Sequence, residues 1–536
     1  MNDSDMHISE RDNVSQAAGI VGFYTFLSRI LGLVRDMVVA TFFGSGMATD
    51  AFFVAFRIPN LLRRLFAEGS LTIAFIPVFT EYLRLKSKED AFEMARVVLT
   101  VLSVILAVVT ILGVLFSPWI VRIQAWGFGG TGLKYELTIM LTRITFPYIL
   151  LISLVALFMG ILNSLRHFAA PAAAPILLNV GIIGATIWIS PHLSQPIVGV
   201  AMGVIIGGIL QVALQIPWII RKGISFFPRW APNHPAVKRI GLLMLPAVFG
   251  SAIYQFNQFM GTLLASFLAE GSVSWLYYAD RLVQFPLGIF AIAISTAALP
   301  SLSRQAAEKD FDKFMDTVNY SMRLTLFITI PAMAGLIILG KPIIQLFFER
   351  GAFDSLSTER TAYALVFYSL GLWAFAGTRI IVSAFYAFQD TKTPVKVAAI
   401  ALIANLVFSL ALMGPLKHGG LALALSIASS IQFCFLVFFL KKKMGAWDPV
   451  PVIISAGKSI IATVVMGLAI WYLHPRWFST NPLSGGWHSA INVICLILIG
   501  VIIYFGLARI FGCRELSSFI NIFSGLKRND VNRTIS

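Results

Sequence analysis

Charged side chains occur inside two stretches of this chain that are long and apolar enough to cross a lipid bilayer. These stretches, 16–43 and 48–84, carry the charged residues Arg29, Arg35, Asp36, Asp50, Arg57, Arg63, Arg64 and Glu68. A charged side chain at the centre of a membrane costs about 2.5–3.5 kcal/mol on insertion scales, so several together should face a hydrated cavity or one another. Arginines outnumber acids in this set, and the predicted cavity would therefore attract an anion.

The spacing and chemistry of the arginines favour a phosphate-bearing ligand. Arg57 and Arg64 are seven residues apart, which places them on one face of a helix. Guanidinium groups bind phosphate oxygens through paired hydrogen bonds, so a group of them is suited to a pyrophosphate. The acids of the set would orient the arginines while the cavity is empty. The alternative is that single arginines reach the membrane surface or form fixed ion pairs, and it applies best to Arg63 and Arg64.

The elements that hold these residues are predicted to be membrane helices. The chain has 536 residues, of which 58% are hydrophobic and 12% charged, and its mean hydropathy is +0.83. A soluble globular protein of this length would be less apolar. At about 20 residues per crossing, we predict an all-α polytopic membrane protein with about fourteen transmembrane helices. Their ranges are 16–43, 48–84, 94–120, 136–164, 170–190, 196–220, 238–268, 272–303, 314–340, 359–388, 394–414, 418–440, 452–473 and 487–511.

The distribution of basic residues predicts the topology. Lys and Arg cluster in alternate loops, as at Lys441, Lys442 and Lys443, whereas loops of the opposite parity, such as GSGMATD and SPHLSQP, have none. Cytoplasmic loops of membrane proteins are enriched in these residues, so we expect both termini to be cytoplasmic. The formal net charge of +16 is explained by these loops, which argues against a nucleic-acid partner.

An internal repeat divides the predicted spans into two lobes. Pro77 and Pro300 are separated by 223 positions, and so are Pro171 and Pro394. The common offset predicts two copies of about six helices each, related by an axis along the membrane normal and enclosing a central cavity. The resulting division is a tail at 1–15, an N-lobe at 16–225, a C-lobe at 226–450, two further spans within 451–512 and a tail at 513–536.

The second copy would supply further charges to the cavity. Arg281 lies 224 positions after Arg57, so it should reach the cleft from the opposite lobe, with Asp280 beside it as a counter-ion. Arg379 is another arginine within an apolar stretch. For Arg379 the sequence supports a structural role as well as it supports a role in the cavity.

Signatures of enzymes are missing from the sequence. The segment AGKS at 456–459 resembles the end of a phosphate-binding loop, but Val452 stands where the leading glycine is needed. The seven histidines form no metal-binding spacing. We therefore expect a transporter without covalent chemistry or cofactor. Its energy would come from a coupling ion or from the membrane potential, which supplies about 2.3 kcal/mol per charge per 100 mV.

Four long strings of the sequence are specific enough to indicate a family. They are FLSRILGLVRDMVVATFFGSGMATDAFFVAFRIPNLLRRLFAEG, FPYILLISLVALFMGILNS, GSVSWLYYADRL and QDTKTPVK. These strings resemble the MurJ (MviN) family of bacterial lipid II flippases, within the multidrug/oligosaccharidyl-lipid/polysaccharide exporter superfamily. The resemblance runs through nearly all the predicted spans. It implies two lobes, and two extra C-terminal helices that help to build a groove for a polyprenyl tail.

The resemblance also implies a location, a substrate and partners. The location would be the bacterial cytoplasmic (inner) membrane. The substrate would be lipid II, an undecaprenyl-diphosphate glycopeptide of peptidoglycan biosynthesis, moved to the periplasmic leaflet by alternating access. Membrane lipids would surround the chain, and proteins of cell-wall synthesis or division would be its protein partners.

Carried over residue by residue, the resemblance assigns cavity roles to residues that membrane energetics had already singled out. These are Arg29, Arg35, Asp36, Asp50, Arg63 and Arg281. Gln284 stands where some members of the family have an acidic residue. Loose similarity suggests Asp390 and Asn405 as ligands of a cation, although a helix cap and a packing residue are the roles that their residue types favour.

Two other classes of function remain as alternatives. A cation-coupled drug exporter, or another glycolipid exporter, would suit the helix pattern, but a drug exporter should have a cavity rich in carboxylates. An enzyme acting on a lipid diphosphate would need a base, a nucleophile or a metal cluster near the arginines, and the sequence shows none. The preferred hypothesis is a lipid II flippase in which arginines of both lobes bind the diphosphate and draw the lobes together.

Overall fold

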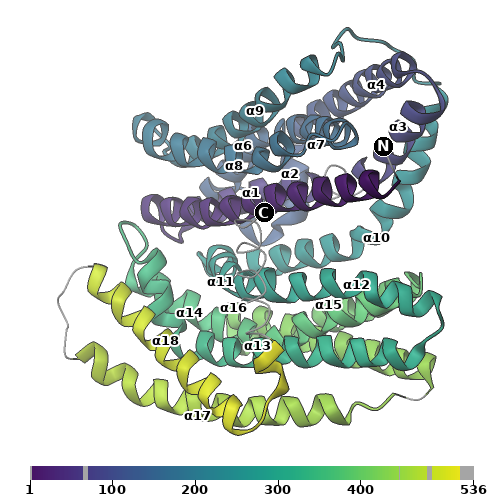
Figure 1. Cartoon of the computed structure of the whole chain (residues 1–536). Coiled ribbons are helices and arrows are strands. Elements are labelled where there is room, and N and C mark those ends of the chain that lie inside the picture. The colour runs from purple at the N-terminus through teal and green to yellow at the C-terminus, as the bar shows by residue number, and fades with distance from the viewer. Residues whose placement is uncertain (1–2, 64–70, 446, 480–485, 519–536) are drawn as a thin grey trace. The chain divides into compact units, whose positions relative to one another are not determined.

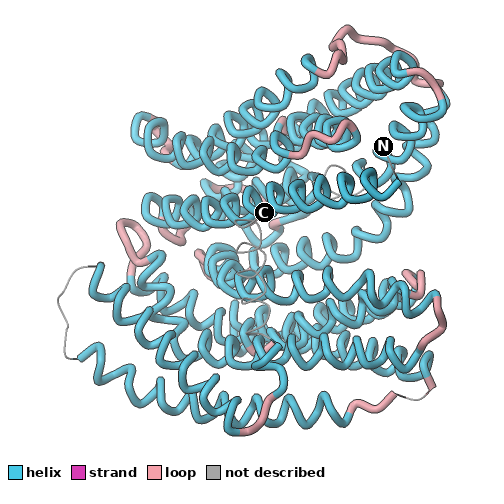
Figure 2. The backbone as a smooth tube through the Cα atoms, viewed as in Figure 1, coloured by secondary structure: helices cyan, strands magenta, loops and turns pink. Residues whose placement is uncertain are grey.

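The regular elements of the chain are helices throughout the part that the structure describes (Figures 1 and 2). This structure is a computed structural model, and it describes residues 3–63, 71–445, 447–479 and 486–518. Contacts divide it into two compact units. The first contains Met1–Ser274 and Arg350–Phe353, and the second contains Trp275–Glu349 and Asp354–Ser536.

The first unit is built from ten α-helices among its described residues, coloured purple to teal in Figure 1. They are α1 (Asp3–Phe43), α2 (Met47–Leu62), α3 (Thr72–Leu85), α4 (Lys88–Leu115), α5 (Ser117–Gln124), α6 (Leu133–Thr145), α7 (Tyr148–Ser164), α8 (Ala169–Gly184), α9 (Ile197–Arg221) and α10 (Pro235–Ser266). Short turns of helix follow α5 and α8, at η2 (Trp126–Phe128), η3 (Ala185–Ile189) and η4 (Ser190–His192).

The helices of the second unit begin with α11, whose first turn still belongs to the first unit. They are α11 (Ser272–Pro286), η5 (Leu287–Ala291), α12 (Ile292–Ala307), α13 (Phe311–Phe348), α14 (Ser355–Ser369), α15 (Leu372–Ala387), α16 (Lys392–Met444), α17 (Val450–Ser479) and α18 (Gly486–Ile510). The long α16 is two helices joined at a kink, because Lys417 has a non-helical backbone (φ 50°, ψ −131°).

Close packing of α8 on α9 organises part of the first unit. A Cβ atom added at Gly181 would lie 2.6 Å from the backbone of Gly207, and one added at Gly203 would lie 2.7 Å from the Cα of Ile182. Larger residues at these glycines would force the helices apart, as in other membrane helix pairs with small residues at their contact. Helix α8 also packs against α1, which brings Asn179 to the charged residues of α1.

In the second unit, α17 and α18 pack against α13 through an apolar cluster. Phe327 of α13, Met466 of α17 and Leu496 of α18 are buried members of it. The hydroxyl of Tyr504 on α18 donates a hydrogen bond to the backbone carbonyl of Phe327 (2.7 Å). The two predicted C-terminal spans are thus a helical hairpin held on α13.

The all-α membrane fold is as predicted, but the count of about fourteen spans is not confirmed. Within the described residues, each predicted span overlaps a helix, half of α16, or consecutive helices such as α6 and α7. Among the described residues, nine helices are long and apolar enough to cross a membrane, or ten if the bent pair α14 and α15 counts as one span. Helix α1 is outside this set, and Arg29, Arg35 and Asp36 lower its hydropathy.

The boundary between the units does not coincide with the predicted boundary between the lobes. The lobes were predicted to meet at residues 225 and 226, whereas the first unit continues to Ser274. The difference arises because α10 packs against α3, α4 and α5. The lobe division describes the repeat rather than the contacts, and it stays a prediction.

Candidate functional site

Helix α1 presents a buried ion pair to α8. Arg35 donates to Oδ1 of Asp36 from Nη2 (2.6 Å) and Nε (3.0 Å), and Asp36 is only 2% exposed. The Nη1 group of Arg35 also donates to Oδ1 of Asn179 (3.3 Å), and Asn179 in turn donates to the carbonyl of Ser28 (3.1 Å). The guanidinium is therefore held in one orientation by an acid beside it and an amide from α8.

Two further arginines, Arg57 and Arg63, have amide partners. Arg57 on α2 donates to Oε1 of Gln258 on α10 (2.9 Å). Arg63, at the end of α2, donates from Nε to Oδ1 of Asn60 (3.0 Å). Both arginines are half-buried, whereas Arg29 on α1 is exposed. The predicted residues Arg64 and Glu68 lie outside the described residues.

Asp50 lies in the first turn of α2 and is 1% exposed. Its carboxylate accepts hydrogen bonds from Nζ of Lys134 (2.8 Å) and from the backbone N–H of Gly271 (2.8 Å). The backbone N–H and the hydroxyl of Ser274 donate to its other oxygen (2.9 and 2.6 Å). Burial of a carboxylate is costly unless hydrogen-bond donors or a cation compensate it, and these four donors do so here. Its cationic partner is thus a lysine, not one of the arginines that Asp50 was predicted to orient.

Lys134 is the residue of this site that sequence reasoning missed. Its Nζ also lies over the ring of Phe128, 4.2 Å from the centroid. One signal was present in the sequence, because Lys134 is a basic residue in a connection whose parity predicts few of them. This signal does not predict the partner of Lys134, because Asp50 is 84 positions away in the sequence.

A second acid completes the contact around Asp50. Oε1 of Glu270 accepts a hydrogen bond from the backbone N–H of Met47, the first residue of α2 (2.7 Å). Asp50 accepts in the same way from Gly271 and Ser274, at the start of α11. Each helix start therefore has its free N–H groups bound by an acid from the other, and helix N-termini favour negative charge. These bonds span 223 and 224 positions, the offset of the internal repeat.

In the second unit, Arg281 and Asp280 of α11 each contact a side chain one helical turn away on the same helix. The guanidinium carbon of Arg281 lies 5.7 Å from the ring centroid of Tyr277, a cation–π contact. The carboxylate of Asp280 accepts from the side-chain amide of Gln284 (3.3 Å). Arg379 on α15 is exposed. The convergence of Arg281 on the arginines of the first unit stays a prediction.

The suggested cation ligands Asp390 and Asn405 do not share a site. Asn405 lies 13 residues into α16, so about 20 Å of helix separates it from Asp390, which precedes that helix. Asp390 instead accepts hydrogen bonds from the backbone and hydroxyl of Thr393 (3.0 and 2.9 Å) and from Nζ of Lys443 (2.9 Å). Burial alone would raise the pKa of Asp390, but the hydrogen bonds from Lys443 and Thr393 outweigh it and lower the pKa. Among the described residues, no group of three or more His, Cys, Asp or Glu is placed to hold a metal ion.

Comparison with known proteins identifies the family. The family model described as lipid II flippase MurJ matches residues 39–483. The chain belongs to the MurJ family. It is 38% identical to a probable lipid II flippase MurJ of Vibrio cholerae, over 92% of this chain and 95% of that protein. It is 35% identical to the lipid II flippase MurJ of Burkholderia cenocepacia, over 93% of this chain and 98% of that protein.

Solved structures agree with the fold. A lipid II flippase MurJ in an inward closed conformation matches with a TM-score of 0.77 and 31% identity, covering 92% of this chain and 98% of that chain. An inward-facing multidrug resistance transporter of the MATE family and the MOP superfamily matches with a TM-score of 0.67 at 14% identity, covering 78% and 95%. The second match shows the fold alone. Together they confirm the predicted all-α fold.

Proposed function

We propose that this chain is a lipid II flippase of the bacterial cytoplasmic membrane, which moves the diphosphate-linked head group between leaflets by alternating access while the polyprenyl tail stays in lipid. Membership of the MurJ family carries the proposal. The reaction makes and breaks no covalent bond. The substrate is an anion, so the protein must offer fixed positive groups within the membrane.

The arginines of α1 and α2 support this role. Arg35 is oriented by Asp36 and Asn179, and Arg57 by Gln258. The hydrogen bonds from the guanidiniums to amide oxygens can be exchanged for bonds to phosphate oxygens, which are stronger because both partners are charged. The planar guanidinium can bind two such oxygens at once. In this proposal Arg281 adds a further guanidinium from the second copy of the repeat.

The reciprocal helix caps join two helix starts that would move apart in the proposed alternating-access cycle. Asp50 and Glu270 join the start of α2 to the start of α11 through Ser274 and Met47. A substrate that binds one state better than the other shifts the balance between them by its difference in affinity. We infer that breaking these caps separates the two helix starts when the cavity opens to the opposite side. Their acids would then face water, which lowers the cost of separation.

Energy for the cycle would come from the membrane potential or a coupled ion. A diphosphate moved across the membrane carries charge through the field, and each elementary charge changes the free energy by about 2.3 kcal/mol per 100 mV. The described residues offer no cluster of acids and histidines for a metal. A monovalent ion or the potential alone is compatible with this arrangement.

The deciding experiment is transport by the purified full-length chain in proteoliposomes. Fluorescent lipid II is placed in one leaflet, and its accessibility to a membrane-impermeant quencher is followed together with its chemical integrity. We expect movement without chemical change. Arg57→Gln should slow it about tenfold or more, because charged hydrogen bonds are lost. Arg304→Gln, at an exposed arginine at the end of α12, is the matched control and should leave the rate unchanged.

Two results would contradict the proposal. Hydrolysis of the diphosphate would indicate a lipid-diphosphate enzyme. Movement of cationic drugs without movement of lipid II would indicate a drug exporter of the same fold. In cells, depletion of the protein should cause lipid II to accumulate in the cytoplasmic leaflet, as measured by its access to an enzyme added from outside.

A further inference from the structure

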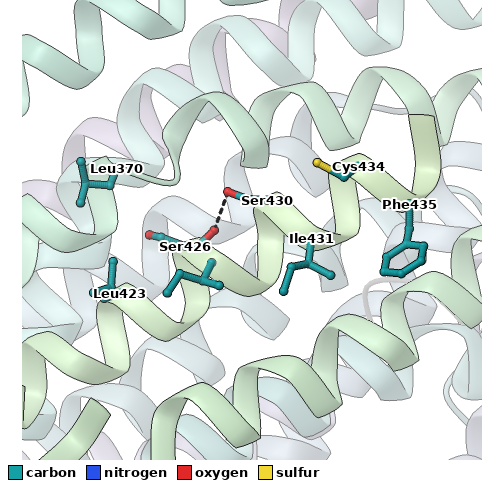
Figure 3. Close-up of a pocket in the computed structure, with 8 residues that line it drawn as sticks. Leu370, Leu423, Ser426, Ser430, Ile431, Cys434 and Phe435 are labelled. Atoms are coloured by element: carbon teal, nitrogen blue, oxygen red, sulfur yellow. Dashed lines mark hydrogen bonds between the residues drawn. The ribbon is translucent and has the colours of Figure 1, made fainter. Parts of the chain in front are cut away.

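An apolar groove runs along the second half of α16 in the second unit. Its volume is about 370 Å³, and it is not enclosed. Figure 3 shows the residues that line it. Leu370, between α14 and α15, forms one edge. The rest of the lining comes from α16, between Leu423 and Phe435, at positions three and four apart. That spacing defines a single face of the helix, and the groove therefore follows α16 for about 18 Å.

The polar groups near the groove are satisfied within the protein. Helices α14 and α15 are bent by 43° at their junction. Ser426 donates from its hydroxyl to the carbonyl of Phe367 (2.7 Å), where the bend leaves helix carbonyls without their usual partners. Ser430 donates to the carbonyl of Ser426 (2.9 Å), the bond drawn in Figure 3. A Cβ at Gly371 would lie 2.6 Å from the hydroxyl of Ser426, so only glycine permits this approach. The groove thus suits an apolar occupant.

Two lysines lie on the groove face of α16, beyond its end. Lys441 follows Cys434 by seven residues, and Lys442 follows Phe435 by the same interval. Seven residues are nearly two full turns, so the lysines share the face of the groove and lie about 10 Å farther along the helix. Both are exposed. The neighbouring Lys443 differs, because its Nζ is bound to Asp390 and lies 5.0 Å from the ring centroid of Phe388.

We propose that the groove and these two lysines form a binding site for an anionic phospholipid. The phosphate binds Lys441 and Lys442 at the membrane surface, and one acyl chain lies in the groove toward Leu423. The charges select the anion, because basic residues at the end of a membrane helix attract anionic head groups. The groove selects an acyl chain, because its lining is mostly apolar and the hydroxyl hydrogens of Ser426 and Ser430 are already donated to backbone carbonyls.

The site is distinct from the arginine cluster of α1 and α2 and from the hairpin of α17 and α18. Because Leu370 lines the groove, an acyl chain bound there would lie against the junction of α14 and α15 (Figure 3). A chain in the groove would therefore support the bent form of that junction. The proposal needs only the membrane location of α16, so it can fail without affecting the proposed transport of lipid II.

Photolabelling of the unmodified full-length chain tests the site directly. The protein is reconstituted with phosphatidylglycerol that carries a diazirine in one acyl chain, or with phosphatidylcholine that carries the same chain. Labelled peptides are then identified by mass spectrometry. We expect labelling within 423–435, and about fivefold or more of it from the anionic lipid at equal concentration. Equal labelling by the two lipids, no label in this segment, or labelling only by a polyprenyl phosphate probe would overturn the proposal.

Two variants separate the head group from the chain. Lys441→Gln with Lys442→Gln should remove the preference for the anionic lipid and leave chain labelling in place. Ile431→Trp should fill the groove and lower labelling by both lipids about fivefold or more. The controls are Lys392→Gln with Lys396→Gln, at exposed lysines near the other end of α16, and Val464→Trp, at an exposed position on α17. If the controls change labelling as much as the variants do, the site is not the one proposed.

Discussion

Asp50 and Ser274 are joined by two hydrogen bonds, although 224 positions separate them in the chain. The backbone N–H and the hydroxyl of Ser274 both donate to Oδ1 of Asp50, at 2.9 and 2.6 Å. Asp50 thereby caps the start of α11, while Glu270 caps the start of α2 through Met47. Two helix starts related by the internal repeat thus stabilise each other through acids.

Replacement of Asp50 by Asn should impair transport. The amide keeps the size of the side chain, but one of its two polar atoms is a donor and cannot accept the bonds that the carboxylate accepts. Loss of charged hydrogen bonds predicts a decrease of about tenfold or more in the transport rate. The measurement is complementation of a depletion strain, together with lipid II movement in proteoliposomes. Asp312→Asn, at an exposed acid in the first turn of α13, is the control, and normal transport by Asp50→Asn would contradict the capping role.

Replacement of Lys134 by Met should destabilise the chain by leaving Asp50 without its cation. Removal of one partner of a buried pair costs about 3–5 kcal/mol, and the partial exposure of Lys134 reduces this to about 1–3 kcal/mol. Thermal unfolding in detergent micelles measures the change. The double variant Asp50→Asn with Lys134→Met should be more stable than Lys134→Met alone, because no unpaired charge remains. Additive losses in the double variant would mean that the two side chains act independently.

Replacement of Arg281 by Lys tests the planar geometry of the guanidinium at constant charge. Lysine cannot make the paired hydrogen bonds of arginine, so transport of lipid II should fall about tenfold. The control is Arg304→Lys, in the same copy of the repeat as Arg281 but at an exposed position at the end of α12. This variant should transport normally. Full complementation of a depletion strain by Arg281→Lys would count against a bidentate clamp on the diphosphate.

The interaction of Asp390 with Lys443 predicts a stability that is insensitive to pH near neutrality. The pKa of Asp390 is lowered in the folded chain, so its contribution to stability is complete above the unfolded carboxyl pKa of about 3.9 and is lost only as the pH falls through the lower, folded value. The difference in melting temperature between the parent and Asp390→Asn should therefore be constant from about pH 6 to about pH 8. A difference that grows or shrinks across this range would contradict the assignment.

Membrane location, helical fold and family were predictable because they depend on properties that sum along the chain. Apolar stretches longer than a bilayer require helices, and strings such as FLSRILGLVRDMVVATFF are specific regardless of how they fold. Arg29, Arg35 and Asp36 could be identified as candidate cavity residues on the same grounds, since any charge in such a stretch is unfavourable unless it faces water or a partner.

The partners of these charges depended on tertiary structure. The sequence by itself determined that Asp50 is an acid within a membrane segment and that Lys134 is a basic residue in a connection where few are expected. Only the packing of α2 against α6 and the start of α11 decided that the two form one buried pair with Ser274. The same holds for the groove beside Leu370, which exists because α14 and α15 bend next to α16. Hydropathy and periodicity describe one helix at a time, whereas a hydrogen bond or a groove requires the distance between atoms of helices far apart in the chain.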